Sequence, residues 1–148
     1  MNPPILNVNG LSKKDKLIVQ EALTADFSCK TLPKGWRKLD EGFAKIVYKK
    51  DNFVVKLCRK GDRDYKVHFR NEVKLYKSIK PKDHKFFARI YAYNSSRIVQ
   101  KFIKGSAVRS DKQWNRALFI ADKYDIDDVN PSNFKIVNNV PIFFDFGL

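Results

Sequence analysis

Apolar and polar residues alternate along the middle of the chain in short runs that are typical of antiparallel strands. The runs are separated by turn residues, among them Asp51-Asn52 and Asn94-Ser95-Ser96. The five expected strands are residues 36–39, 46–49, 53–58, 86–93 and 97–103. Because consecutive runs are joined by short turns or a single helical segment, we expect them to form one antiparallel sheet.

Three segments carry apolar residues at helical spacing and predict helices. They cover residues 12–27, 64–79 and 111–123. Ser12 is a candidate N-cap for the first, with Asp15 in the first turn. Its apolar side predicts a helix that braces the sheet, although a partner-binding appendage is the alternative. In the third segment, one face combines Trp114, Ala117, Leu118 and Ala121.

The last residues of the chain predict a hairpin with polar landmarks around it. Residues 134–137 and 140–144 are apolar runs that flank the turn Asn138-Asn139. Such a hairpin brings Asp145 back beside Asn133. The Asp145 carboxylate and the Asn133 amide oxygen can together hold magnesium, which leaves Asp128 available to accept a proton.

Composition places the chain among folded globular proteins. Its 148 residues suit one domain with its own core. No apolar run approaches the ~20 residues of a membrane-spanning helix, and the first residues do not resemble a signal peptide. Cys29 and Cys58 lack the spacing of paired ligands, so we expect two free thiols and a cytoplasmic protein.

The net charge of +14 is unevenly distributed. Residues 117–148 hold five acids and two bases, a balance of −3, which leaves +17 on residues 1–116. A field of this size attracts acidic or phosphate-rich partners. The plainer interpretation is a solvated, lysine-rich surface, and the sequence leaves both open.

In order and spacing, the landmarks Asp128, Asn133 and Asp145-Phe146-Gly147 resemble the catalytic and magnesium loops of the protein kinase-like superfamily. Lys56, in Val-Val-Lys, matches the phosphate-binding lysine of that family. Glu72, sixteen residues later, matches the glutamate of the kinase C-helix. The resemblance implies that Asp128 is the catalytic base, with ATP and magnesium as cofactors.

The same resemblance implies positions for the nucleotide. Gly42, Phe43 and Ala44 match the loop that covers the phosphates, although the family's other glycines are missing. Asp40 and Glu41 would repel phosphate if they pointed inward. The adenine edge is expected at backbone groups of the hinge. The hinge residues are Gln100, Lys101 and Ile103.

The implied architecture is an α+β fold. It has a kinase N-lobe-like five-stranded antiparallel sheet with a C-helix, and a vestigial C-lobe of one helix, the catalytic loop and a β-hairpin. Residues 1–35 are expected to form a helical extension and linker, and residues 36–148 a single minimal kinase-like domain. The helices that dock peptides in kinases have no counterpart, so a substrate is expected to dock elsewhere.

The sequence leaves three alternative interpretations of the function open. The first is a minimal, atypical serine/threonine phosphotransferase that acts on a protein. The second is a catalytically inactive kinase-like module whose basic surface binds and modulates an acidic protein or a nucleic acid. The third is an unrelated α+β domain. The expected state is a monomer or a small homo-oligomer without a membrane partner.

Overall fold

The computed structural model describes residues 5–42, 44–59, 65–127 and 129–146. The chain divides into two compact units. Residues 1–69 and 90–102 form the first, which we call the sheet unit, and residues 70–89 and 103–148 form the second, the hairpin unit. Each unit is described by itself.

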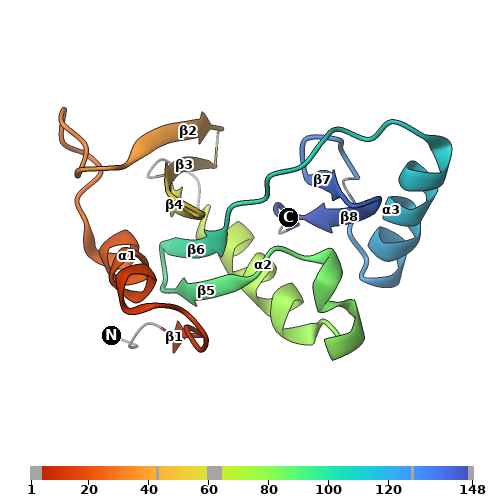
Figure 1. The fold of residues 1–148 in the computed structure, drawn as a ribbon, viewed down its shortest axis with the longest axis horizontal. Coiled ribbons are helices and arrows are strands. Elements are labelled where there is room, and N and C mark those ends of the chain that lie inside the picture. Colours follow the sequence, from red (N-terminus) through yellow and green to blue (C-terminus); the bar gives the residue numbers. More distant parts are fainter. Residues whose placement is uncertain (1–4, 43, 60–64, 128, 147–148) are drawn as a thin grey trace. The chain divides into compact units, whose positions relative to one another are not determined.

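The sheet unit contains six antiparallel strands in the order β1-β5-β6-β4-β3-β2 (Figure 1). They are β1 (Ile5–Leu6), β2 (Arg37–Glu41), β3 (Lys45–Lys50), β4 (Phe53–Cys58), β5 (Ile90–Tyr93) and β6 (Arg97–Lys101). The five predicted strands, β2 to β6, are all present and lie side by side. Strand β1 was not predicted; it pairs with β5 at one edge, where Ile5 lies opposite Tyr93.

The predicted strand 86–93 is shorter than expected and begins at Ile90. Before it, Pro81–Phe86 form a 3-10 helix, η1. Proline suits the start of a helix because its φ is already fixed and its missing N–H is not needed there. Phe86 and Phe87 are buried in the hairpin unit, so their apolar character reflects burial and not a longer strand.

Helix α1 (Lys13–Thr24) braces the sheet, as predicted. The Ser12 hydroxyl accepts the N–H of Asp15 at 3.1 Å and caps the helix. The buried side of α1 joins the core on one face of the sheet. This core includes Ile18, Val19, Ala22, Leu23, Phe27, Trp36, Tyr48, Phe53, Val55 and Val99.

Strand alternation sends a second set of side chains to the opposite face of the sheet. On β4, Phe53 and Val55 face the α1 core, so Val54 and Lys56 face away from it. On β6, Val99 faces the α1 core, and Ile98 and Gln100 therefore share the face of Lys56. The register places Lys56 opposite Ile98 and Val54 opposite Gln100.

Helix α2 (Lys66–Ser78) is the chain's connection from the sheet unit into the hairpin unit. The hairpin unit continues through η1, α3 (Asp111–Lys123), β7 (Phe134–Val137) and β8 (Val140–Phe143). The predicted hairpin is confirmed. Its turn residues Asn138 and Asn139 have φ of 51° and 63°, a left-handed conformation that asparagine tolerates well.

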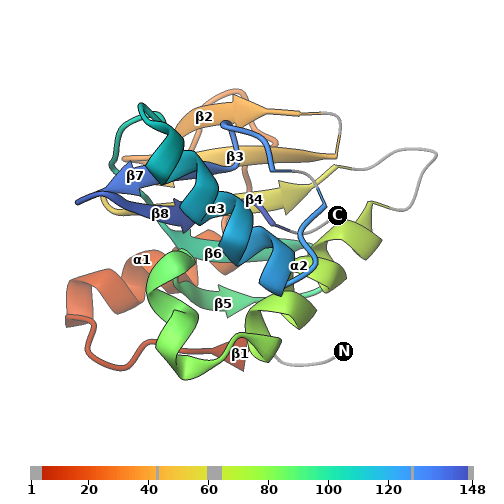
Figure 2. The same ribbon diagram turned by 90° about the vertical axis from the view of Figure 1, so that its right-hand side faces the viewer.

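Helix α3 has the predicted bounds and lies along the hairpin (Figure 2). Ser110 caps it by accepting the N–H of Gln113 at 3.2 Å. Its buried side consists of Ala117, Ile120 and Ala121. Leu118 was expected on this side but is 39% exposed, because Ile120 occupies the inward position one half-turn further on.

No helix in the described part of the chain is both long enough and apolar enough to cross a membrane.

Candidate functional site

Lys56 lies at the centre of the sheet unit, on a strand flanked on both sides by paired strands. Its side chain is 3% exposed, and among the described residues it is the only buried lysine or arginine. Burial of an ammonium group costs free energy unless other groups stabilise the charge. Most of the 30 basic residues of the chain lie at the surface. Lys56 is instead buried, at the position predicted to bind phosphate.

Gln100 shares the sheet face of Lys56 and is 0% exposed. Neither its side-chain nitrogen nor its side-chain oxygen has a hydrogen-bond partner among the described residues. Buried amides are normally hydrogen bonded, so this side chain offers one acceptor and one donor pair to a bound molecule. The sequence indicated Gln100 only through its backbone, and the side chain is the stronger feature.

Of the other hinge residues, Lys101 ends β6 opposite Phe53, and its side chain is exposed. The next residue, Phe102, donates its N–H to the Asn52 carbonyl at 2.8 Å. Ile103 is buried and belongs to the hairpin unit. Recognition of adenine by these backbone groups stays a prediction.

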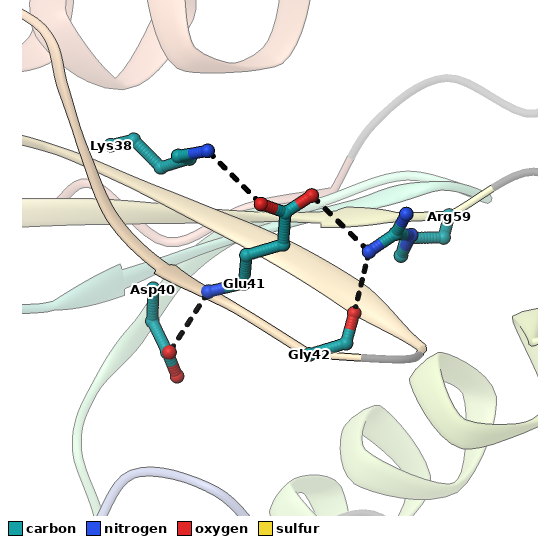
Figure 3. Close-up of polar contacts among 5 residues, drawn as sticks. All are labelled: Lys38, Asp40, Glu41, Gly42 and Arg59. Carbon is teal, nitrogen blue, oxygen red and sulfur yellow. Dashed lines mark hydrogen bonds and ion pairs between the residues drawn. The ribbon is translucent and has the colours of Figure 1, made fainter.

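The tip of the β2–β3 hairpin is held by Arg59, which follows β4 (Figure 3). The Arg59 guanidinium donates to the Gly42 carbonyl at 2.9 Å and pairs with the Glu41 carboxylate at 3.2 Å. Its backbone N–H donates to the Ala44 carbonyl at 2.9 Å. No sequence pattern indicated this role for Arg59, because its side-chain bonds join residues seventeen and eighteen positions apart.

These bonds change the expected electrostatics of the hairpin. Lys38 also pairs with the Glu41 carboxylate, at 3.0 Å (Figure 3). The hydrogen bond from Lys38, with a further contribution from Arg59, holds the pKa of Glu41 below its ordinary value. Two cations thus offset the charge of Glu41, one of the two acids that were expected to repel phosphate. The other acid, Asp40, accepts the backbone N–H of Glu41 at 2.8 Å.

The N–H of Gly42 is also used within the hairpin, since it donates to the Lys45 carbonyl at 2.9 Å. The role of Gly42 and Ala44 in a loop that covers phosphate stays a prediction. Phe43, the third, lies outside the described residues.

In the hairpin unit, Glu72 is buried on α2 with 3% exposure. One of its carboxylate oxygens accepts the backbone N–H of Phe146 at 3.3 Å. The helix therefore holds the Asp145-Phe146 segment by a charge-assisted bond. Lys56 belongs to the other unit, and the predicted pairing of Lys56 with Glu72 stays a prediction.

The hairpin brings Asn133 and Asp145 together, as predicted. The Asn133 carbonyl accepts the N–H of Phe144 at 3.0 Å and the N–H of Asp145 at 3.3 Å. Asn130 stabilises the loop before Asn133, because its side-chain oxygen accepts both the N–H and the hydroxyl of Ser132 at 3.0 Å. The backbone thus fixes both predicted metal ligands at one end of the hairpin.

An amide oxygen and a carboxylate are hard oxygen donors, which fit magnesium. No group of three histidine, cysteine or acidic side chains suited to a metal occurs among the described residues. Asp128, the predicted base, lies outside the described residues.

A second buried carboxylate in the hairpin unit, Asp83, was not indicated by the sequence. It is 6% exposed, accepts a hydrogen bond from the Tyr124 hydroxyl and pairs with Lys123 at 2.8 Å. The bond from Lys123 and then that from Tyr124 lower the pKa of Asp83. Burial, followed by the bond to Asp83, raises the pKa of Tyr124. This cluster links η1 to the end of α3.

No protein-family model and no curated protein sequence matches the chain. Solved structures do. The streptomycin–ATP ternary complex of APH(2")-IIa matches with a TM-score of 0.56 and 13% identity, over 97% of this chain and 73% of that one. WbdD in co-crystal with a kinase inhibitor matches with a TM-score of 0.54 and 16% identity, over 79% of this chain and 32% of that one. Another structure of WbdD, described as a bifunctional kinase-methyltransferase, matches with a TM-score of 0.52 and 14% identity.

At these identities the likeness shows the fold alone. The chain has a kinase-like α+β fold with a kinase N-lobe-like antiparallel sheet, which confirms the predicted fold class and resemblance. It spans about a third of WbdD and about three quarters of APH(2")-IIa.

Proposed function

On the basis of this kinase-like fold, we propose that the chain is an ATP- and magnesium-dependent phosphotransferase that acts on serine or threonine hydroxyls of a protein. The observation that carries the proposal is the burial of Lys56 on the sheet face that it shares with Gln100, whose amide has no hydrogen-bond partner in the described part of the chain. A cation and an unsatisfied amide in the interior suit a ligand that carries both phosphate and a hydrogen-bonding ring.

In this proposal the Lys56 ammonium binds the nucleotide phosphates, and the Glu72 carboxylate orients that lysine. The Gln100 amide binds the base. Asn133 and Asp145 hold magnesium, which neutralises phosphate charge when bound. The oxygen of the substrate hydroxyl bonds to the γ-phosphorus of ATP, and Asp128 accepts the proton that this hydroxyl loses. The bond between the γ-phosphorus and the oxygen that bridges it to the β-phosphate breaks, and ADP is released.

A transfer assay with γ-labelled ATP, on the protein alone and with a cell lysate, tests this function. We expect label on the protein or on a discrete lysate band, and its loss in Asp128→Ala and Lys56→Met. Lys16→Met, which removes an exposed lysine of α1, is the matched control and should keep the activity. Absence of label with the wild-type protein, or label that survives in Lys56→Met and Asp128→Ala, would refute the proposed transfer.

The second candidate is a kinase-like binding module without transferase activity. It is favoured by the hairpin, where the Gly42 N–H bonds the Lys45 carbonyl instead of being turned toward a ligand. The two candidates differ in a melting experiment combined with the transfer assay. The binding module is identified by two results together. ATP with magnesium raises the melting temperature of the wild type but not that of Asp145→Ala, and the transfer assay detects no label.

A further inference from the structure

The outward side of α3 has a large apolar side chain at its centre. Phe119 is 69% exposed, more than any other large apolar side chain of the described residues, and its neighbour Leu118 is 39% exposed. With 3.6 residues per turn, Phe119 lies almost opposite the fully buried Ala117 on the helix. Single exposed apolar residues are common on protein surfaces, so the ring alone does not identify a partner. The residues that surround it do.

Phe119 belongs to a stripe along α3, which we call the outer stripe: Lys112, Asn115, Phe119 and Asp122. Their spacing of three, four and three residues keeps them on one side of the helix, and all four are exposed. The stripe is basic at its first residue and acidic at its last. Within the described part of the chain, the side chains of Lys112, Asn115 and Asp122 form no hydrogen bond or ion pair.

This order of charges is complementary to itself when two copies of α3 run antiparallel. A two-fold axis beside Ala117 places residues that are equally far before and after it opposite each other. Lys112, five residues before, then faces Asp122 of the other copy, five residues after, and the symmetry repeats this contact. In a parallel pair each charge would face its own copy, and the like charges would repel each other.

The remaining positions agree with the same register. Asp111 and Lys123 lie six residues before and after Ala117, so they too face each other with opposite sign. Phe119 faces Asn115 of the other copy, and the two phenylalanine rings lie about 6 Å apart along the helices. Each ring would thus be covered by the other ring and by the stem of Lys112, since lysine buries its methylene groups beside apolar surface.

We infer that the outer stripe of α3 binds a second copy of this chain in an antiparallel, two-fold symmetric pair. A helix of thirteen residues is about 20 Å long, so the contact is smaller than the ~800 Å² per partner of a standard stable interface. The dimer is therefore weak and reversible, with a dissociation constant between about 1 μM and 1 mM. The inference does not depend on phosphoryl transfer.

Sedimentation equilibrium of the full chain, from about 10 μM to about 1 mM, tests the dimer. About 0.3 M salt screens the general repulsion between two chains of net charge +14. We expect the average mass to rise from 17.3 kDa toward twice that value. Phe119→Ser should weaken association at least about tenfold, because it removes the central apolar contact. Leu17→Ser, at an apolar residue of α1 that is 58% exposed, is the matched control and should associate as the wild type does.

Charge reversal distinguishes this pairing from other modes of association. Lys112→Glu and Asp122→Lys each place like charges at both symmetric contacts, so each variant alone should associate at least about tenfold more weakly. In an equimolar mixture the two reversed sites face each other, and association should return to within about threefold of the wild type. Thermal melts check that each variant is folded.

Three results would overturn the inference. The first is a wild type that stays monomeric up to about 1 mM. The second is association that Phe119→Ser leaves unchanged or that Leu17→Ser weakens equally. The third is a mixture of folded Lys112→Glu and Asp122→Lys that associates no better than either variant alone, which would assign the outer stripe to another partner or another register.

Discussion

The Gln100 amide, which has no hydrogen-bond partner among the described residues, predicts a substitution that stabilises the protein while it weakens the proposed nucleotide site. In Gln100→Leu a side chain of similar size replaces the amide at a position that is 0% exposed. Neither amide atom has a partner among the described residues, so no hydrogen bond between them is lost. The perturbation therefore removes a buried polar group and leaves the packing of the strand nearly unchanged.

The magnitude follows from the cost of burying a polar group without a hydrogen bond, about 1–3 kcal/mol in proteins. Leucine does not have the exact shape of glutamine, and this imperfect fit reduces the gain. The reduction is below about 1.5 kcal/mol, the usual limit for swaps that conserve volume. We expect a net stabilisation of roughly 1–2 kcal/mol. For a chain of this size, that raises the melting temperature by about 2–8 °C.

Urea denaturation and a thermal melt of the ligand-free protein measure the effect. Gln113→Leu is a matched control, because the Gln113 amide accepts the Arg109 N–H at 2.8 Å and donates to Asn139 at 3.0 Å. The same exchange there should lower stability by about 0.5–1.5 kcal/mol for each lost bond. A fall in the stability of Gln100→Leu similar to that of the control would refute the reasoning, because it would mean that the Gln100 amide is satisfied.

Three further predictions concern the hairpin unit. Gly105→Ala should destabilise the protein by about 1–3 kcal/mol in urea, because the added Cβ would lie 2.7 Å from the Ile136 carbonyl oxygen; an unchanged midpoint would contradict this close approach. Asn138→Val should cost about 1–2 kcal/mol, since φ is 51° there, whereas Asn138→Gly should be tolerated, and equal melting temperatures for the two variants would count against the left-handed turn. The lowered pKa of Asp83 means that its ionised form stabilises the fold at neutral pH and that this contribution is lost as pH falls below about 4, so the gap in melting temperature between wild type and Asp83→Asn should close on acidification; a gap that stays constant with pH would refute it.

Local patterns account for the elements that the sequence predicted correctly. The turn at Asp51 and the turn at Asn138 both use residues that tolerate positive φ, and apolar alternation on either side of each sets the strands. Strand β1 escaped prediction because two residues are too few for a periodic signal. The register of α3 differed at Leu118, since the choice between neighbouring apolar positions depends on tertiary packing.

For the site, the sequence located individual residues but not the bonds between them. The meeting of Asn133 and Asp145 followed from a two-residue turn, which is a local feature. The bonds of Arg59 to the hairpin tip, and the missing partners of Gln100, depend on segments that are distant in the chain. No periodicity records whether a buried polar group finds a partner, so these features required the structure.

Calorimetric titration of ATP with magnesium into the wild type and into Lys56→Met tests the central claim most directly. The account predicts saturable binding at one site per chain and its loss, or a weakening of at least about tenfold, in Lys56→Met, while Lys16→Met binds as the wild type does. Equal binding by Lys56→Met and the wild type, or no binding by either, would contradict a nucleotide site built on the buried lysine of β4.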